Sequence, residues 1–543
     1  MNINSIVLTR LLIGLRMAWV GLFLWRPLIN QTYCPQYIQD KLLMQILDKN
    51  RNTDIGKKFG FSKIKNYADF QKTVPVRHYE DLREFIARQE DDQKPCITAE
   101  QPVMYAQTSG TTGKPKYIPI LPETIKQYRC SQHCVAYAIH SAMPKTYSGK
   151  VLAIVSPAVE GYLPSGTPYG SMSGLIYRSM PEFVSANYVI PASVFEVADY
   201  ELKYRLITVF ALAEENITLI ATANPSTLLK IAEILNTHWA ALVHEIGTGN
   251  SYGLHANPQR AEALKNLHAR KCVIIFADIW PNLQTVTTWT YGSCAVLIPG
   301  LKRQLSATTR IVEMGYLSSE FRGSITIDAV RNKAIPTIHE NFFEFVARDR
   351  WDDNTAEFQT ISSLVEGKQY YVIVTTQNGL YRYFINDIIE VDGWYNGTPT
   401  IRFVQKGKGV VNLTGEKLYE SQVIEAVNRI KLALNIDFNF FMMLGCPDLL
   451  RYTLYIAAEP FAQVTVLLEK HLSDLNIEFS AKRQSGRLLQ TSVCFVSRMT
   501  ADAYKKHCLE QGQREGQFKF LKLQNSRDCA FDFEPYKVNV HAD

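Results

Sequence analysis

The sequence predicts an α/β fold with a large N-terminal domain and a small C-terminal domain. Helical and strand-like patterns alternate along the 543 residues, without a repeat or a low-complexity tract. Short apolar runs that end in turn formers, among them "KVLAIVSP", "ITLIATANP" and "KCVIIFADIWP", are typical of buried strands. Two glycines and two lysines in "VQKGKGV", residues 404–410, indicate a hinge. We therefore predict domains at residues 1–405 and 406–543, because about 130 residues suffice for a separate domain.

The first apolar stretch, residues 6–28, is predicted to be a packed helix. Arg10, Arg16 and Arg26 interrupt it, and its longest uncharged run, residues 17–25, is too short for a bilayer span of about 20 residues. No small-residue cleavage site of a signal peptide follows the run. A helix on a membrane surface and a signal peptide are the alternatives, and membrane contact is not favoured. We expect a cytoplasmic protein.

Three later segments have clear local patterns. Apolar residues at helical spacing predict helices in "QYIQDKLLMQILDKN" and "RHYEDLREFIARQ". The turn dipeptide at Asn378 and Gly379, in "QYYVIVTTQNGLYRYFI", predicts a β-hairpin and sets its register. An antiparallel pair is therefore expected beside the buried strands.

Composition excludes several classes of protein. With 46% hydrophobic and 20% charged residues, the chain is neither disordered nor fibrous. The net charge of +6 is mild and no block of Lys and Arg resembles a nucleic-acid-binding arm, so we expect a small anion as partner and no nucleic acid. Ten scattered cysteines fit a reducing compartment. "CSQHC", with Cys130, His133 and Cys134, lacks a second ligand pair, so a core helix is preferred there over a metal site.

The stretch "MYAQTSGTTGKPKYIPI", residues 104–120, has the composition of a phosphate-binding loop. Glycine amides can converge on phosphate oxygens, while hydroxyls and lysines add donors and positive charge. It is not the P-loop of ordinary NTPases, because only two residues separate Gly110 from Gly113, and Pro115 follows Lys114. A solvated loop of turn-forming residues is the alternative.

"TSGTTGKPK" resembles the signature of the adenylate-forming superfamily, which includes firefly luciferase and the acyl-CoA synthetases. Over nearly its whole length, the chain is more similar to one branch, the auxin-responsive acyl acid amido synthetases of plants and bacteria, and it looks like a bacterial-type member. The other motifs that carry this resemblance are, in order, "NRNTDIGKKFGF", "DFQKTVPVRHYEDL", "GYLSSE", "LYRYFINDIIEVDGW", "NLTGEKLYE" and "GQFKF".

The resemblance implies a fold and a reaction. The fold would be a large N-terminal adenylate-forming domain of mixed sheets and helices, with a small mobile α+β C-terminal domain. The enzyme would adenylate a small carboxylic acid with ATP and Mg²⁺, then pass the acyl group to an amine, that of an amino acid. Small residues around Tyr162, Tyr169 and Trp289 would leave room for a flat or short acid.

Two alternative functions stay open. The acceptor could be coenzyme A or a carrier thiol, although "VQKGKGV" and "GQFKFLKL" lack the hinge and C-terminal motifs expected of such ligases. In a different class, the chain could be a nucleotide-binding pseudoenzyme at a membrane surface.

By the same resemblance, the glycine-rich loop and "GYLSSE" would form the phosphate and metal site. The loop residues that would hold the ATP phosphates are Thr108, Ser109, Gly110, Thr111, Thr112, Gly113 and Lys116, the last also in a catalytic role. Tyr316 would pack on the adenine, and Ser318 and Ser319 would approach the α-phosphate. Glu320 would hold Mg²⁺, which prefers few carboxylates together with phosphate oxygens.

"YRYFIND" resembles the family's third motif, in which Asp387 would accept hydrogen bonds from both ribose hydroxyls. The sequence departs from the family pattern at two positions. Phe384 stands where the family usually has an arginine, so one charged contact is missing. Asn386 replaces a glycine, and since asparagine tolerates positive φ, we expect the turn to survive.

The C-terminal domain supplies two further lysines in this comparison. "NLTGEKLYE" resembles a linker strand with Glu416 and a nucleotide-binding Lys417, and Lys406 takes the place of a hinge arginine. Lys519 in "GQFKF" resembles a catalytic lysine that reaches the reacting phosphate when the small domain closes. A solvated surface lysine is the alternative for Lys519.

Overall fold

The computed structural model describes residues 13–108, 115–180, 182–352, 355–407, 409–436, 438, 440–510 and 521–538. It divides into two compact units. Unit 1 comprises residues 13–108 and 116–404, and unit 2 comprises Pro115 and the described residues from 405 onward.

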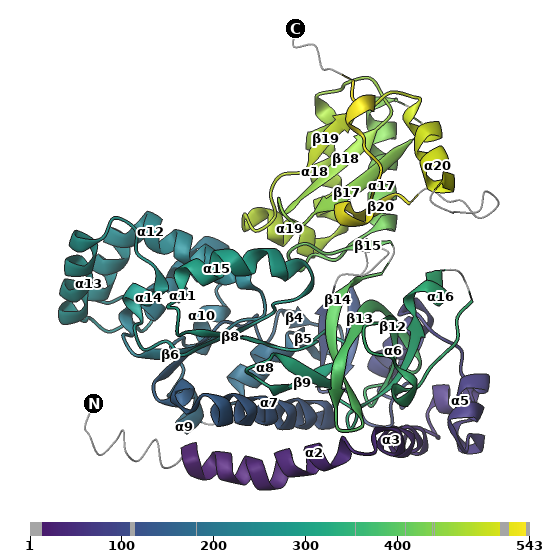
Figure 1. The fold of residues 1–543 in the computed structure, drawn as a ribbon, viewed down its shortest axis with the longest axis horizontal. Helices are drawn as coiled ribbons and strands as arrows, with labels where there is room; N and C mark the ends of the chain where they lie inside the picture. The colour runs from purple at the N-terminus through teal and green to yellow at the C-terminus, as the bar shows by residue number, and fades with distance from the viewer. Residues whose placement is uncertain are drawn as a thin grey trace. The chain divides into compact units, whose positions relative to one another are not determined.

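A parallel four-stranded sheet forms one layer of unit 1 (Figure 1). Its strands, in spatial order, are β3 (Lys150–Ala153), β6 (Ile217–Ala221), β7 (Thr285–Thr288) and β8 (Arg310–Glu313). "KVLAIVSP" and "ITLIATANP" are thus confirmed as strands. The helices that share a buried core with this sheet include α11 (Tyr200–Ala213), α12 (Pro225–Thr248), α13 (Pro258–Arg270) and α15 (Ile298–Gln304). Because the strands are parallel, their carboxyl ends share one edge, where ligands bind in open α/β sheets.

The strand prediction for "KCVIIFADIWP" is wrong. This segment contains a short helix, α14 (Phe276–Ile279), and no strand. The amide of Asn236 in α12 holds the backbone of Ile274 by two hydrogen bonds of 3.1 and 3.0 Å, and Trp280 is buried. A short apolar run fits a buried helix as well as a buried strand, so periodicity alone could not decide.

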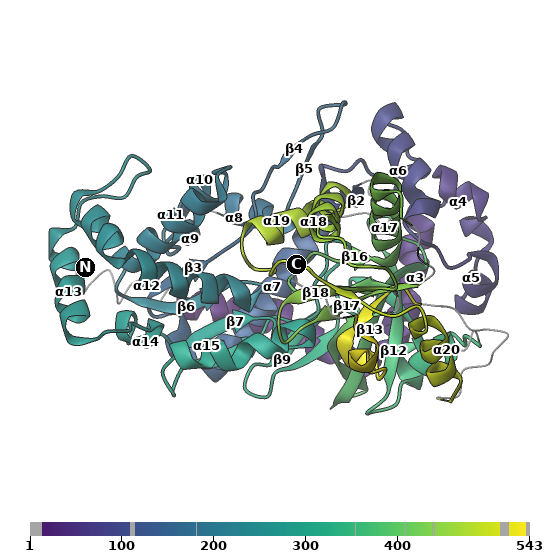
Figure 2. The same cartoon turned by 90° about the horizontal axis from the view of Figure 1, so that it is seen from above.

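Two other four-stranded sheets of unit 1 contain antiparallel hairpins, and β9 (Ser324–Asp328) and β10 (Lys333–Pro336) form a separate antiparallel pair. One four-stranded sheet comprises β11 (Asn341–Ala347), β12 (Gln369–Thr376), β13 (Tyr383–Tyr395) and β14 (Thr398–Lys406). Its β12–β13 pairing, with Val374 opposite Tyr383, confirms the predicted hairpin. The other comprises β2 (Lys116–Ile120), β1 (Met104–Thr108), β5 (Pro168–Gly170) and β4 (Gly161–Tyr162). The β4–β5 hairpin projects from the body of unit 1 (Figure 2).

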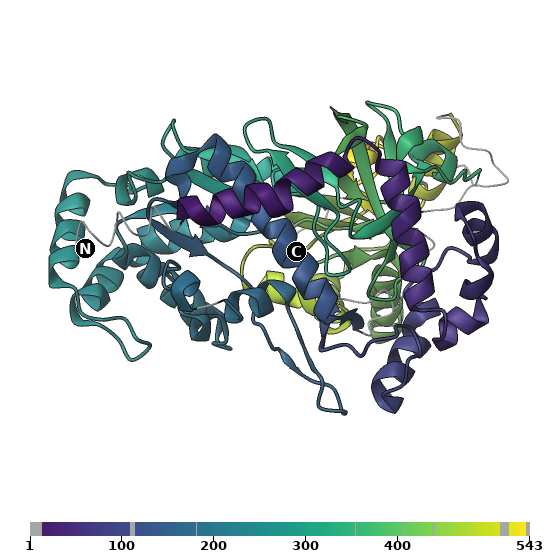
Figure 3. The ribbon, with the colours of Figure 1, turned by 90° about the horizontal axis from the view of Figure 1, so that it is seen from below.

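The predicted helices of unit 1 are confirmed. The first two patterned segments form α3 (Pro35–Lys49) and α6 (Glu80–Asp92). "CSQHC" lies within α7 (Pro122–Ala142), and among the described residues no group of three or more His, Cys, Asp or Glu side chains is arranged to hold a metal ion. Residues 13–20 are helical and continue through η1 (Gly21–Trp25) and α2 (Arg26–Gln31), so that the described part of the apolar stretch packs along α7 (Figure 3), while residues 6–12 lie outside the described residues.

Unit 2 has an α+β architecture with its own buried core. Its mixed sheet comprises β19 (Ser492–Phe495), β18 (Arg451–Ile456), β17 (Phe441–Cys446) and β20 (Leu523–Asn525). Its helices are α17 (Glu420–Leu434), α18 (Gln463–Leu475), α19 (Ile477–Gln484) and α20 (Thr500–Glu510). A small two-stranded sheet is formed by β15 (Val410–Val411) and β16 (Leu418–Tyr419).

The remaining elements are short. They are α4 (Asp54–Lys58), α5 (Tyr67–Thr73), α8 (Met172–Arg178), α9 (Glu182–Ser185), α10 (Ala192–Phe195), α16 (Arg348–Asp352), β9 (Ser324–Asp328), β10 (Lys333–Pro336), and the 3₁₀ turns η2 (Phe61–Lys63), η3 (Pro144–Tyr147), η4 (Gly292–Leu297), η5 (Ile361–Ser363), η7 (Ser526–Asp528) and η8 (Glu534–Tyr536).

Candidate active site

The strands β1 and β2 flank the predicted phosphate-binding loop. Thr108 ends β1, Lys116 begins β2, and the two residues are paired across the hairpin. The Lys116 ammonium lies 5.6 Å from the centroid of the Tyr79 ring, and the Tyr79 hydroxyl accepts a hydrogen bond of 2.7 Å from the backbone N–H of Tyr117. The predicted site residues Ser109, Gly110, Thr111, Thr112, Gly113 and Lys519 lie outside the described residues.

Tyr316 connects the second predicted motif to the third. Its hydroxyl donates a hydrogen bond of 2.6 Å to Oδ2 of Asp387 in β13, 71 residues away in the sequence. Burial and the neighbouring Asp387 carboxylate raise the pKa of Tyr316 well above its ordinary value, so the hydroxyl stays a donor. The ring stacks on Phe403, with centroids 5.8 Å apart. A Cβ at Gly323 would lie 2.2 Å from the Tyr316 ring, so this position requires glycine.

The third motif, "YRYFIND", contains residues of the candidate site and residues that pack in the core. Asn386 has φ = 59°, so the predicted positive-φ position exists and asparagine occupies it. Phe384 faces an aromatic cluster and stacks on Trp351 with centroids 4.3 Å apart. Arg382 pairs with the buried Glu344 at 2.8 Å. An arginine in place of Phe384 would therefore meet aromatic rings, which explains the departure from the family pattern as core packing.

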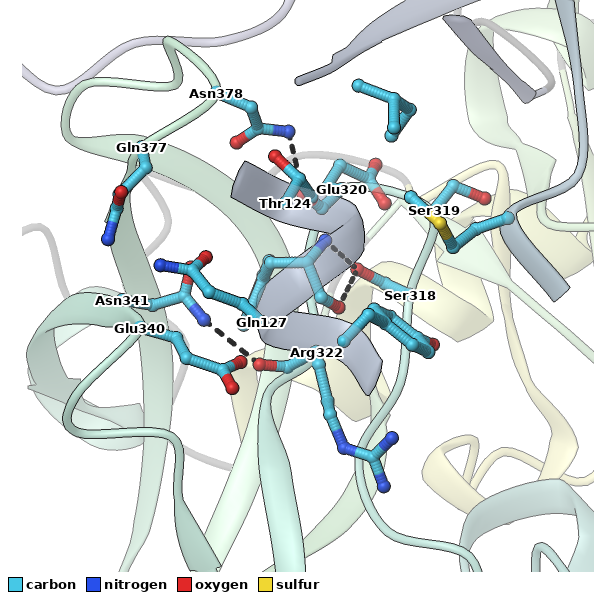
Figure 4. Close-up of a pocket in the computed structure, with 14 residues that line it drawn as sticks. Thr124, Gln127, Ser318, Ser319, Glu320, Arg322, Glu340, Asn341, Gln377 and Asn378 are labelled. Atoms are coloured by element: carbon cyan, nitrogen blue, oxygen red, sulfur yellow. Dashed lines mark hydrogen bonds between the residues drawn. The ribbon is translucent and has the colours of Figure 1, made fainter. Parts of the chain in front are cut away.

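A pocket in unit 1 opens beside "GYLSSE" (Figure 4). It is bordered by the start of α7, by the loop before β9, and by the ends of β2, β11 and β12. The lining residues are Ile120, Thr124, Gln127, Tyr128, Met172, Ser318, Ser319, Glu320, Phe321, Arg322, Glu340, Asn341, Gln377 and Asn378. Three residues of the second predicted motif therefore line the same pocket: Ser318, Ser319 and Glu320. Most of the other lining residues are polar.

Asn378 fastens this pocket to the strand that follows the glycine-rich loop. Its Nδ2 donates to the carbonyl of Pro119 in β2 at 2.9 Å and to the carbonyl of Glu320 at 3.3 Å. The sequence reading recognised Asn378 only as a turn former. Asn378 also links the pocket to β2, and this second role follows from its burial beside the hairpin turn. Sequence patterns do not report that burial.

Two charged side chains are buried at the pocket wall. The guanidinium of Arg322 donates to Oε1 of Gln132 at 3.2 Å and lies 5.3 Å from the ring centroid of Tyr128. The carboxylate of Glu340 accepts a hydrogen bond from the Ser131 hydroxyl. Neither residue was identified from the sequence, because "EFRG" and "IHEN" match no motif by themselves.

Glu313 braces the backbone that leads into Tyr316. Its carboxylate accepts hydrogen bonds from the backbone N–H of Thr290 at 2.5 Å, the Thr290 hydroxyl at 2.6 Å and the backbone N–H of Gly315 at 3.0 Å. Burial raises the pKa of Glu313 to about 7, against the effect of these donors. Glu313 ends β8, so it ties two loops at the carboxyl edge of the parallel sheet.

The aromatic residues expected around the acid do not line this pocket. Tyr162 is 68% exposed on the β4–β5 hairpin. The Tyr169 ring packs on Tyr117 with centroids 5.4 Å apart, and Trp289 Nε1 donates to the carbonyl of Gly315 at 3.1 Å. From the same glycine-rich segment only Met172 reaches the pocket. Tyr162, Tyr169 and Trp289 thus lie outside this pocket, and their place around the acid stays a prediction.

In unit 2, Lys417 follows a rigid turn. Lys417 has φ = 46°, and its carbonyl accepts a hydrogen bond of 3.2 Å from Asn476. The buried Glu416 carboxylate accepts from the backbone N–H groups of Leu413 and Thr414 at 2.6 and 2.7 Å. Glu416 therefore holds the turn, and the contact of Lys417 with nucleotide stays a prediction, as does the hinge role of Lys406.

Comparison with known proteins shows three successive matches along the chain. They are the GH3 family N-terminal domain over residues 26–310, the GH3 family central domain over residues 334–406 and the GH3 family C-terminal domain over residues 421–528. The indole-3-acetic acid-amido synthetase GH3.4 of Arabidopsis thaliana is 25% identical over 422 residues, which cover 72% of this chain and 70% of that protein.

Solved structures give the same fold. The GH3.15 acyl acid amido synthetase matches with a TM-score of 0.65 and 21% identity over 96% of this chain and 97% of that one. A 2-hydroxyisobutyryl-CoA ligase matches with a TM-score of 0.52 and 14% identity over 90% and 89% of the two chains. The predicted adenylate-forming fold is confirmed.

Proposed function

The chain belongs to the GH3 family, and on this premise we propose that it is an ATP-dependent acyl acid amido synthetase whose acid binds in the pocket beside Ser318. The enzyme activates a carboxylic acid as its acyl adenylate and transfers the acyl group to the amine of an amino acid. The observation that supports this proposal is the hydrogen bond between Tyr316 and Asp387, which joins two motifs that are predicted to bind the nucleotide.

The first half-reaction is attack of a carboxylate oxygen on the α-phosphorus of ATP, with pyrophosphate as the leaving group. Negative charge grows on the phosphate oxygens, so cations and hydrogen-bond donors around them lower the barrier. Lys116 and the hydroxyls of Thr108, Ser318 and Ser319 supply such groups from unit 1, and Lys519 is assigned the same task from the C-terminal domain. Asp387 accepts hydrogen bonds from the ribose hydroxyls.

Glu320 fits a role in holding Mg²⁺. Its side chain belongs to the pocket wall, and its backbone carbonyl is fixed by Asn378. One carboxylate is a suitable protein share, because Mg²⁺ keeps phosphate oxygens and water as its other ligands. Glu320 would hold the ion there, and the ion would supply positive charge to the ATP phosphates.

The second half-reaction is attack of the amine nitrogen on the acyl carbon, with AMP as the leaving group. The acid that fits the pocket is small and carries a polar substituent, because amides from Gln127, Asn341 and Gln377 line the wall together with Arg322 and Glu340. The amides of Gln127 and Gln377 are only half-buried at this wall, so an acid with a polar substituent can form hydrogen bonds there that a purely apolar acid cannot.

We place the reaction in the cytoplasm. All ten cysteines are free thiols. Free thiols suit a reducing compartment.

The experiment is a screen of small carboxylic acids against the amino acids, with ATP and Mg²⁺ and with coenzyme A in parallel, read by mass spectrometry. The expected product is an amide, and AMP should form with it in equal amount. Formation of a thioester in preference to an amide, or the absence of any acyl product from folded protein, would contradict the proposal.

A further inference from the structure

The N-terminal helix of residues 13–31 has an inner face that is anchored to unit 1. Val20 and Leu28 are buried, and the Trp25 ring packs on Tyr137 of α7 with centroids 5.2 Å apart. The Arg16 guanidinium lies 2.8 Å from Nε2 of His133, also in α7. Burial, with Arg16 nearby, lowers the pKa of His133 to about 4, so the imidazole stays neutral and accepts this bond. The helix is therefore held in a fixed orientation.

The outer face of the same helix presents large apolar side chains to solvent. Leu15 and Phe23 are each 61% exposed, and Trp19 and Leu22 are each 50% exposed. The rings of Trp19 and Phe23 lie 5.7 Å apart, so the residues form one patch. Figure 3 shows the helix lying outermost on this face of unit 1, over α7. Contiguous exposed apolar surface of this kind marks a contact site rather than ordinary solvated surface.

The charge of this region has a single sign. Residues 1–39 contain no aspartate or glutamate, and the first acidic residue of the chain is Asp40. Arg26 is exposed beside the apolar patch, and Arg16 is exposed on the side of the helix that contacts His133. Within the part of the chain that the structure describes, neither arginine makes an ion pair. The partner that complements this face is apolar at its centre and anionic at its rim.

We propose that the outer face of residues 13–31 docks on the surface of an anionic phospholipid bilayer. Trp and Phe favour the boundary between headgroups and acyl chains, and exposed arginines favour anionic headgroups. No helix in the described residues is long and apolar enough to cross a bilayer, so the helix lies in the plane of the interface. A second copy of the chain fits this face less well. A symmetric dimer would bring together two cationic faces without acidic residues, and their charges would repel each other.

The test is flotation of the full-length protein with phosphatidylcholine vesicles that either contain or lack phosphatidylglycerol. We expect the protein to float with the anionic vesicles and to stay behind with the neutral ones, and high salt should weaken the binding. Trp19→Ser with Phe23→Ser removes the apolar centre and should lower the bound fraction about tenfold or more. Arg26→Gln should lower the bound fraction about fivefold, because one basic residue near an anionic membrane surface contributes an attraction of about that size.

The matched control is the double variant Tyr252→Ser with Val273→Ser, which removes two exposed apolar side chains elsewhere in unit 1. It should float like the unchanged protein, and both double variants should keep the unchanged thermal unfolding profile. The proposal fails if the Trp19/Phe23 variant still floats or if neutral vesicles bind equally well. It also fails if light scattering shows a dimer that this variant dissociates while no vesicle is bound.

Discussion

Two buried carboxylates in the same sheet of unit 1, Glu344 in β11 and Asp387 in β13, each accept a hydrogen bond from a tyrosine hydroxyl, and Glu344 is in addition paired with an arginine. Glu344 faces Arg382 through two hydrogen bonds of 2.8 and 2.9 Å, so charge is matched by charge. Asp387 accepts from the neutral hydroxyl of Tyr316. The first arrangement resembles a core ion pair, and the second is the one that we propose contacts the ribose hydroxyls. One motif, "YRYFIND", thus contains a structural arginine and, five residues later, the aspartate that we propose binds the ribose.

Removal of the arginine should have the largest effect on stability. Arg382→Met leaves the Glu344 carboxylate buried without its counter-charge and frees the carbonyls of Gln71 and Val74. The expected loss in the free energy of unfolding is about 3 to 5 kcal/mol, measured by urea denaturation. Adding Glu344→Gln should recover part of the loss. A loss below about 1 kcal/mol would show that the pair is not a structural element.

The substitution Asp387→Asn should instead act on catalysis. The Tyr316 hydroxyl can still donate to the amide oxygen, so the free energy of unfolding should change by less than about 1 kcal/mol. Loss of two charge-assisted bonds to the ribose should lower ATP–pyrophosphate exchange about 100-fold, chiefly through the KM for ATP. If this variant unfolds as readily as Arg382→Met, the distinction between the two carboxylates is wrong.

A third buried carboxylate, Glu313, extends the comparison to pH, because its ionisation should make the stability of the protein depend on pH. Burial raises its pKa from 4.5 to about 7 in the folded protein. The folded state therefore binds more protons than the unfolded state between these values, and stability contributed by this group falls as pH rises from 4.5 through 7. Glu313→Gln should flatten that part of the pH–stability profile of the whole protein by about 1 to 3 kcal/mol.

The matched control for Glu313 is Glu262→Gln, at an exposed position of α13. It should leave the pH–stability profile unchanged. An identical profile for Glu313→Gln and the unchanged protein would mean that Glu313 is ionised throughout, as its three hydrogen-bond donors favour.

The smallest effect is expected at Tyr162. Tyr162 projects on the β4–β5 hairpin and is absent from the pocket wall, so Tyr162→Ser should leave the KM for the acid unchanged within about twofold. Steady-state kinetics with the acid identified by the screen provide the measurement. If the KM for the acid rises strongly while the KM for ATP does not, Tyr162 contacts the acid.

The sequence predicted the elements that depend on local patterns. The turn at Asn378 and Gly379, the positive φ of Asn386 and the helices α3 and α6 all follow from short-range chemistry, and the structure confirms them. The family motifs also identified Ser318, Ser319 and Glu320, which line one pocket.

The features of the site that the sequence does not predict are contacts between segments that lie far apart in the chain. The links from Asn378 to β2 and from Tyr316 to Asp387 join residues far apart in the chain. Arg322 and Glu340 are ordinary charged residues until their burial under α7 is known. The apolar run around Ile274 was assigned to a strand because periodicity is ambiguous over so few residues.

The most direct measurement is carboxylate-dependent exchange of labelled pyrophosphate into ATP, compared between the unchanged protein and Asp387→Asn. We expect exchange that requires both an acid and Mg²⁺ in the unchanged protein, and a loss of about 100-fold in the variant at equal folded fraction. Absence of exchange with every acid tested, by protein that is folded and binds ATP, would contradict the adenylation chemistry.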